Sequence, residues 1–195
     1  LGDVYKRQGL LLIVSILLTI GLLMMTSASV EIASSRYGDP FFHLKRQSVF
    51  GVMGFLVMLI TLHVPIKFWR SISGYLLLLS FALLLTVLIP GVGKAVNGSA
   101  RWIDLGFFNL QPSELAKVFI VIYVAAYLER HADAVRGGFI GFMKPMLVVT
   151  GAMGLLHFEP DHGAMVILLL TTFCLIFLAG ARITRFLPLL AMCMG

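Results

Sequence analysis

Charged residues are scarce in this chain of 195 residues. Asp, Glu, Lys and Arg together make up 12% of it, whereas soluble domains carry about 25%. Hydrophobic residues make up 59%. A soluble fold of this length would have too little polar surface to cover itself. The composition therefore excludes an ordinary soluble domain and indicates that a lipid bilayer surrounds the chain.

A continuous basic stripe is also absent. The formal net charge is +6, from 15 Lys and Arg against nine Asp and Glu. These basic residues stand singly or in pairs between long apolar runs, whereas nucleic-acid-binding proteins gather them on one face. We expect no nucleic-acid partner.

Cysteine is almost missing. The two cysteines, Cys174 and Cys193, both lie inside apolar segments. This placement predicts small buried hydrophobic residues and neither a disulfide nor a metal site.

Long apolar runs, in contrast, are abundant. A helix needs about 20 mostly apolar residues to span a membrane. The sequence predicts an all-α, polytopic transmembrane helix bundle with six spans, at residues 9–30, 47–66, 71–93, 112–128, 145–158 and 162–181. A seventh run starts at residue 186, and we expect the chain to be a fragment that contains only its beginning.

The first eight residues differ in character from the rest. Residues 1–8 are mostly polar and precede the first apolar run. We expect them to be a non-native or disordered leader. Residues 9–195 are then the N-terminal part of a single transmembrane domain.

The distribution of basic residues predicts the orientation. With a cytoplasmic N-terminus, the inner segments hold nine Lys and Arg and the outer loops hold five. Cytoplasmic loops of membrane proteins carry the excess of basic residues. We therefore expect the N-terminus inside.

The most informative stretch is residues 97–117. Pro112 suits the first turn of a helix, where its missing N–H costs nothing, and Gln111 or a neighbour could cap that helix. Ser113 and Glu114 then fall in the first turn, and Lys117 lies on the same face as Glu114.

The pair Glu114 and Lys117 allows two interpretations. A charge at the bilayer centre costs about 2.5–3.5 kcal/mol on insertion scales, and pairing lowers that cost. One interpretation is a structural ion pair that locks the helix to its neighbours. The other is a polar, water-filled cavity in which Lys117 meets an anionic substrate. The residues themselves favour neither, and a cavity open to the outer leaflet fits both.

Arg101 and Lys94 precede that helix in the predicted outer loop, which is apolar around Trp102 and suits the membrane interface. Two cations there could bind a lipid-linked phosphate or pyrophosphate, because Arg holds phosphate oxygens bidentately. Ordinary headgroup contact is the simpler explanation.

The segment from His157 to Gly163 forms a second polar cluster between two spans. Glu159 and Asp161 could serve acid–base chemistry or a cation, and the two histidines could suggest zinc. No third zinc ligand has recognisable spacing. A tight turn in which Asp161 caps the next helix is the leading interpretation.

At these residues the chain resembles the SEDS family of bacterial shape, elongation, division and sporulation membrane proteins. Three motifs carry the resemblance: residues 97–103 running into 111–117, the turn 159–163 and the helix end 177–181. Residues 26–29 and 39–46 resemble the division branch more than the elongation branch.

The resemblance implies a ten-helix fold and a peptidoglycan glycosyltransferase that polymerises lipid II into glycan strands during cell division. It implies a class B penicillin-binding transpeptidase and other divisome membrane proteins as partners. The implied location is the bacterial inner membrane at the division septum. No cofactor is implied, although a divalent cation is left open.

By the same resemblance, Arg101, Gln111, Ser113, Glu114, Lys117 and Asp161 would line or approach a polar substrate cavity. The family's proposed catalytic Asp lies in an outer loop after the seventh helix, beyond this chain. The fragment alone is therefore expected to be inactive. Two other functions stay open: a lipid II flippase, and a scaffold that recruits the transpeptidase.

Overall fold

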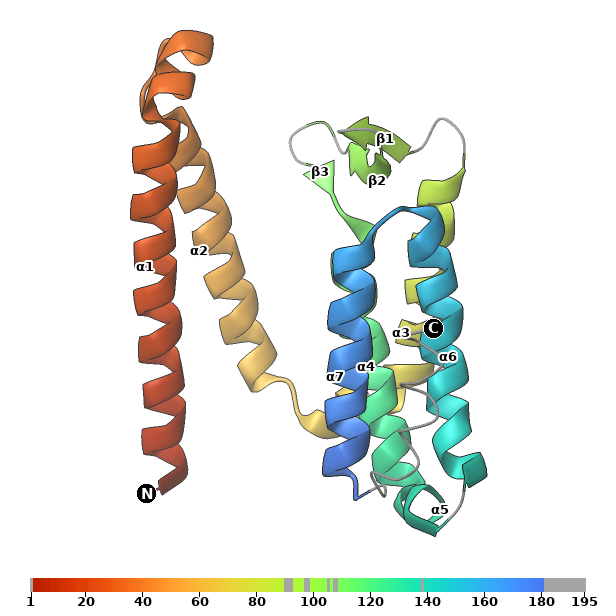
Figure 1. Ribbon diagram of the computed structural model, residues 1–195. Coiled ribbons are helices and arrows are strands. Elements are labelled where there is room, and N and C mark those ends of the chain that lie inside the picture. The colour runs from red at the N-terminus through yellow and green to blue at the C-terminus, as the bar shows by residue number, and fades with distance from the viewer. Residues whose placement is uncertain are drawn as a thin grey trace. The chain divides into compact units, whose positions relative to one another are not determined.

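The chain is described by a computed structural model for residues 2–89, 93–96, 99–104, 106, 109–137 and 139–180. The helices are α1 (Gly2–Tyr37), α2 (Phe42–His63), α3 (Ile66–Leu88), α4 (Pro112–Arg130), α5 (Ala132–Gly137), α6 (Phe139–Phe158) and α7 (His162–Leu178) (Figure 1). The strands are β1 (Gly93–Val96), β2 (Ser99–Asp104) and β3 (Asn109–Leu110).

The six longer helices overlap the six predicted spans, with α2 and α3 each beginning about five residues earlier than predicted, and this confirms a polytopic membrane helix bundle. Helices α1, α2 and α3 are long and apolar enough to cross a membrane. Helices α6 and α7 are apolar but shorter in their described parts, and α4 carries charged residues near both ends. The predicted start of a seventh span falls on residues 186–195, outside the described part of the chain.

The chain divides into two compact units, Leu1–Pro65 and Ile66–Gly195. The first unit is the hairpin of α1 and α2. Asp39 organises its turn, because its carboxylate accepts hydrogen bonds from the Phe41 N–H at 3.0 Å and from Lys45 Nζ at 2.7 Å. The Tyr37 and Phe42 rings stack across the turn with centroids 4.1 Å apart. No residue of α2 is buried, so the hairpin offers its apolar side chains to lipid.

Helix α1 includes the backbone of residues 2–8. The expected leader at residues 1–8 is thus continuous with the first helix over its described residues, and its non-native origin stays a prediction.

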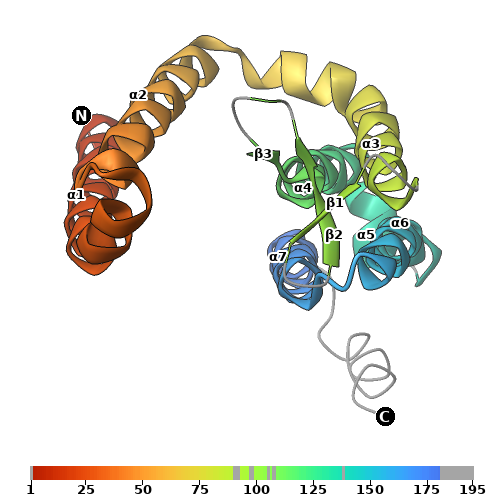
Figure 2. The same cartoon turned by 90° about the horizontal axis from the view of Figure 1, so that it is seen from above.

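The second unit is a bundle of α3, α4, α6 and α7, with the short helix α5 at one end (Figures 1 and 2). Membrane helices associate through close packing of small residues, because lipid is as apolar as their side chains. Ser80, Ala116 and Ala152 are fully or almost fully buried and allow this approach. Larger side chains such as Leu84, Ile120 and Leu168 fill the remaining core.

Polar contacts tie α3 to α4 at the end away from the strands. Arg70 pairs with Glu129 at 2.7 Å. Arg130 donates to the Arg70 carbonyl and to Ser73 Oγ, the latter at 3.2 Å. Nearby, Arg136 Nε donates to the Ala179 carbonyl at the end of α7 at 3.1 Å. Charged side chains therefore connect the helices at this end of the bundle, through one ion pair and through hydrogen bonds to backbone carbonyls.

Three antiparallel strands lie across the other end of the bundle, in the order β1-β2-β3 (Figure 2). Lys94 pairs with Trp102, and Ile103 pairs with Leu110. The sequence predicted an irregular interfacial segment here, so the strands are an addition to the predicted all-α fold.

The prediction that Cys174 is buried is wrong. Its side chain is exposed on α7, because a helix that is apolar all round gives no sign of which residues face lipid. Cys193 lies outside the described residues.

Candidate functional site

Asp161 forms the centre of a polar cluster where α6 turns into α7. Its Oδ1 accepts a hydrogen bond from the Ala164 N–H at 3.2 Å, so it caps α7 as predicted. Its Oδ2 accepts from Ser113 Oγ at 2.8 Å and from Gln111 Nε2 at 3.1 Å. Asp161 is almost fully buried. One carboxylate thus joins the start of α4 to the start of α7.

The start of α4 places both donors. Pro112 occupies the first helical turn, as its missing N–H allows. Gln111 precedes it in an extended conformation and makes no side-chain cap, although the sequence suggested one. Its amide instead reaches Asp161 and Ser113. Ser113 is fully buried in the first turn.

Arg101 approaches the same carboxylate from strand β2. One guanidinium nitrogen lies 3.8 Å from Asp161 Oδ1, and the side chain is about one-third exposed. Its Nε is buried and has no hydrogen-bond partner among the described residues. Lys94, the other predicted cation, lies on the neighbouring strand β1, and its side chain is outside the described part of the structure.

The surroundings keep Asp161 ionised. Burial raises its pKa, but hydrogen bonds from Ser113, the Ala164 N–H and Gln111, together with the charge of Arg101, outweigh burial and leave the pKa below its ordinary value. Donors that favour the charged form have this effect. The site therefore holds a fixed negative charge that a neighbouring cation balances.

Glu159, two residues earlier, has the opposite character. It is 1% exposed, and neither carboxyl oxygen has a hydrogen-bond partner among the described residues. Burial and the nearby Asp161 raise its pKa to about 7, while Arg101 lowers it in part. From the sequence, Glu159 and Asp161 together suggested acid–base chemistry or a cation site, but Glu159 was not among the residues predicted to line the substrate cavity.

Glu114 and Lys117 pair on α4, with Lys117 Nζ 2.9 Å from Glu114 Oε1. The Lys117 side chain is 13% exposed and that of Glu114 is 60% exposed. The predicted pairing is therefore present. The Glu114 carboxylate can reach water or headgroups, whereas the Lys117 side chain is mostly covered by protein.

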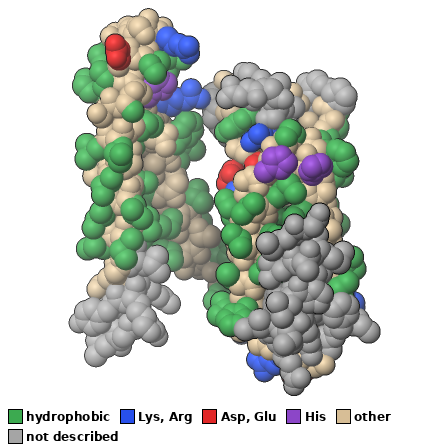
Figure 3. Space-filling model, in the orientation of Figure 1, with side chains coloured by type: hydrophobic (Ala, Val, Ile, Leu, Met, Phe, Trp, Pro, Cys, Tyr) green, Lys and Arg blue, Asp and Glu red, His purple; other side chains and the backbone are tan. Residues whose placement is uncertain are grey.

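His157 and His162 lie at the ends of α6 and α7, with ring centroids 5.9 Å apart. Both side chains are exposed. Across the residues that the structure describes, no group of three or more His, Cys, Asp and Glu is placed to hold a metal ion. On this face of the second unit, histidine and charged side chains gather near one end, with hydrophobic side chains below them (Figure 3).

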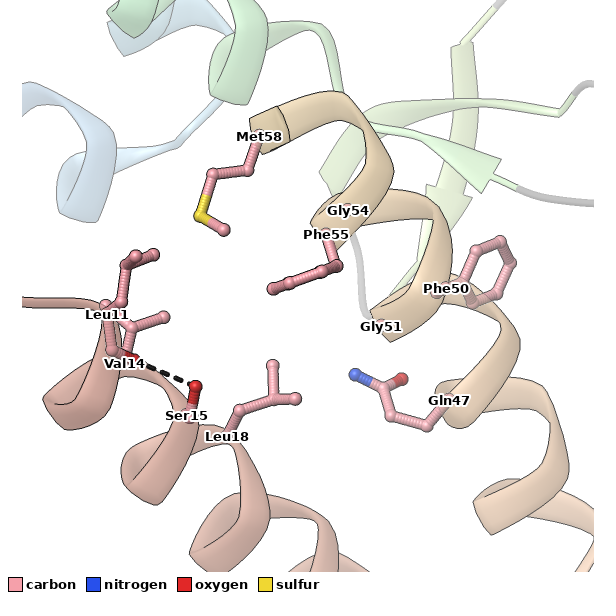
Figure 4. A pocket seen from close by; sticks show the side chains of 10 residues that line it. All are labelled: Leu11, Val14, Ser15, Leu18, Gln47, Phe50, Gly51, Gly54, Phe55 and Met58. Carbon is pink, nitrogen blue, oxygen red and sulfur yellow. Dashed lines mark hydrogen bonds between the residues drawn. The ribbon is translucent and has the colours of Figure 1, made fainter. Parts of the chain in front are cut away.

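The first unit has a hollow of its own between α1 and α2, with a volume of about 330 Å³. Leu18, Phe55 and Met58 point into it, and the Gln47 amide also projects inward (Figure 4). Ser15 lines it too, but its hydroxyl donates to the Leu11 carbonyl at 2.8 Å. The lining is mainly apolar and carries no charge, which suits a hydrocarbon chain better than a reaction.

Residues 7–195 match the family of cell cycle proteins that includes FtsW, RodA and SpoVE. The chain is 47% identical over 178 residues to the probable peptidoglycan glycosyltransferase FtsW of Thioalkalivibrio sulfidiphilus, covering 91% of this chain and 44% of that protein. It is 45% identical to the probable peptidoglycan glycosyltransferase FtsW of Coxiella burnetii, covering 92% of this chain and 48% of that protein. The chain thus spans about half the length of these relatives.

Solved structures give the same result at lower identity. The crystal structure of the rod shape determining protein RodA of Thermus thermophilus superposes with a TM-score of 0.67 at 28% identity, covering 89% of this chain and 58% of that chain. A structure of a peptidoglycan synthase complex that coordinates polymerization and crosslinking superposes with a TM-score of 0.70 at 29% identity, covering 89% of this chain and 51% of that chain. The greater identity to FtsW than to RodA confirms the predicted likeness to the division branch.

Proposed function

Because the chain belongs to the FtsW, RodA and SpoVE family of cell cycle proteins, we propose that it is the N-terminal part of a peptidoglycan glycosyltransferase that polymerises lipid II. Residues 9–195 form one portion of a single transmembrane domain in this proposal. The observation that carries it is the buried cluster of Asp161, Ser113 and Gln111 with Arg101 beside it, at one end of the bundle.

Lipid II suits such a site because it is an amphiphile with a pyrophosphate between its sugars and its hydrocarbon chain. Arg101 lies at the end of the bundle where a membrane lipid carries its headgroup, and guanidinium binds phosphate oxygens bidentately. Lys117 adds a second cation one helical turn into α4. Asp161 holds Arg101, Gln111 and Ser113 in place, and we assign it no catalytic step.

The reaction is a transfer to the anomeric carbon. A sugar hydroxyl oxygen bonds to that carbon, the bond from the carbon to the pyrophosphate oxygen breaks, and undecaprenyl pyrophosphate leaves with the bonding electron pair. A base must take the hydroxyl proton, and we place that base in the part of the protein that follows these residues. Cations near the leaving group stabilise the charge that develops on it.

The chain is a multi-pass protein of the bacterial inner membrane. We further propose a cytoplasmic N-terminus, a septal location, and a class B penicillin-binding transpeptidase and other divisome membrane proteins as partners. The similar complex, which couples polymerization with crosslinking, supports a transpeptidase partner.

Two other functions are separable from this one by experiment. Purified full-length protein, given lipid II in detergent without another polymerase, should form glycan chains. Lipid II scrambling in liposomes without any polymerisation would support a flippase and contradict the proposal. Normal polymerisation by Lys117→Ala would show that Lys117 does not belong to the substrate site, and would favour a scaffold role for this region. Lys67→Ala, which removes a lysine elsewhere in the bundle, is the matched control.

Exchange of the ion pair distinguishes its two interpretations. The double variant Glu114→Lys with Lys117→Glu keeps the pair but reverses its direction. If Lys117 contacts an anion, the exchange should restore only part of the activity lost in Glu114→Ala. Full restoration would show that the pair is structural.

A further inference from the structure

Two buried polar groups next to Asp161 have no hydrogen-bond partner among the described residues: the carboxyl of Glu159 and the Nε of Arg101. Most buried polar groups in folded proteins are hydrogen-bonded, and an exception calls for an explanation. Here one group is an acceptor when ionised, the other is a donor, and both belong to the surroundings of the same aspartate.

Asp161, in contrast, is well supplied with donors. Ser113, Gln111 and the Ala164 N–H all bond to its carboxylate. Arg101 lies 3.8 Å from it, which is an ion pair but longer than a hydrogen bond. Arg101 is therefore the most loosely held partner of Asp161 and the one whose loss would leave the carboxylate satisfied.

We propose that Glu159 is a positioning residue that acts through Arg101, by offering its guanidinium a second, buried carboxylate. When Glu159 is neutral, Arg101 stays beside Asp161 with part of its side chain exposed and available to an anion. When Glu159 is ionised, the guanidinium turns inward toward it. The consequence for a pyrophosphate ligand rests on the proposed function; the competition between two carboxylates does not.

Among the cationic side chains that the structure describes in the second unit, Arg101 is the one that acts on Glu159. Lys117 on α4 is occupied by Glu114, and the basic residues of α3 lie in its first turns, at the far end of the bundle. The other titratable side chains described at this end are Asp161, His157, His162 and the exposed Asp104 of β2. Lys94 on β1 also belongs to this end, with its side chain outside the described part of the structure. Because the pKa of Glu159 is about 7, the exchange would occur near neutral pH.

Chemical modification of arginine tests the inward movement without any substrate. Full-length protein in nanodiscs is treated with phenylglyoxal at pH 6 and pH 8, and the rate at Arg101 is divided by the rate at the exposed Arg36, which corrects for the reagent. The ratio should fall several-fold from pH 6 to pH 8 in the wild type and stay constant in Glu159→Gln. Asp133→Asn, which removes an exposed carboxyl elsewhere in the unit, should behave as the wild type. A constant ratio in the wild type, or an equal fall in Glu159→Gln, would overturn the proposal.

Ligand binding tests the consequence. The quantity measured is the Kd of farnesyl pyrophosphate for the wild type divided by its Kd for Glu159→Gln. This ratio should be about tenfold higher at pH 8 than at pH 6, as expected for loss of one charged hydrogen bond. The ionisation of the probe itself affects both proteins equally and therefore cancels in this ratio. A ratio independent of pH would overturn the role in binding. Failure of both proteins to bind the probe at any pH would count against the proposed function, while the modification experiment would still decide the role of Glu159.

Discussion

At the scale of single residues, two carboxylates separated by one proline have opposite environments. Asp161 accepts hydrogen bonds from three donors, and its pKa is lowered. Glu159 is buried without a partner among the described residues, and its pKa is raised. Neighbouring acids whose pKa values are pushed apart in this way are typical of functional sites.

Ser113 is the strongest test of the network. Ser113→Ala removes the shortest hydrogen bond to Asp161 and should lower the free energy of unfolding by about 1–2 kcal/mol, since the carboxylate stays buried. Thermal unfolding in nanodiscs would measure it. Ser80→Ala is the matched control, because Ser80 is equally buried but bonds only to Leu77 of its own helix. Equal losses in the two variants would show that Asp161 does not depend on Ser113.

Glu159 should make stability depend on pH. Below its ordinary pKa of 4.5 the carboxyl is neutral in both states, and up to about 7 only the unfolded state releases the proton. Stability therefore falls as the pH rises through this window. Relative to Glu159→Gln, the wild type should lose about 1–3 kcal/mol between pH 5 and pH 8. A difference that does not change with pH would contradict the raised pKa, and Asp133→Asn serves as the control.

Part of the site could be predicted from the sequence. Pro112 at the helix start and Asp161 as a cap follow from local rules, and both were predicted. The convergence of Arg101, Gln111 and Ser113 on Asp161 depends on contacts across about 50 residues or more. No local rule gives such contacts. The burial of Glu159 was not predicted, because it depends on the packing of several elements.

At the scale of elements, the helices were predictable and the strands were less so. Apolar runs of about 20 residues give a strong signal for spans, and all six appear near their predicted bounds. Strands β1 and β2 are short and lie in a Gly-rich stretch. The pair Asn97-Gly98 between them in the sequence is a strong two-residue hairpin signal, which the sequence analysis did not use.

The approach of α5 to α6 can be tested at Gly141. A Cβ there would collide with the Ala134 carbonyl oxygen, so the backbone would have to move. Gly141→Ala should lower the free energy of unfolding by about 1–3 kcal/mol, as overpacking does. Gly154→Ala on the same helix has nothing within 4 Å of the added carbon and should be neutral or slightly stabilising. A stable Gly141→Ala protein would show that the two helices separate easily.

At the scale of the whole molecule, the bundle has two chemically different ends. One end carries the strands and the Asp161 cluster, and the other carries the Arg70–Glu129 pair, Arg130 and Arg136. The excess of Lys and Arg in the predicted inner segments fits the orientation proposed above.

Cysteine labelling would establish this orientation. Starting from full-length protein with Cys174 and Cys193 changed to Ser, a membrane-impermeant maleimide applied from outside the cell should label Asp104→Cys. It should label Asp133→Cys only after the membrane is opened. The reverse pattern would place the N-terminus outside and the Asp161 cluster on the cytoplasmic side, which would contradict the proposed access to lipid II from the outer leaflet.

The separation of Ser113 and Asp161 by 48 residues has a consequence for biosynthesis. At about 5–20 residues per second, a ribosome needs roughly 2–10 s to make the intervening chain. During that interval the start of α4 has emerged while its carboxylate partner has not yet been synthesised. Water at the membrane surface must serve Gln111 and Ser113 until the turn between α6 and α7 has been made, so the cluster around Asp161 cannot form while α4 is being inserted.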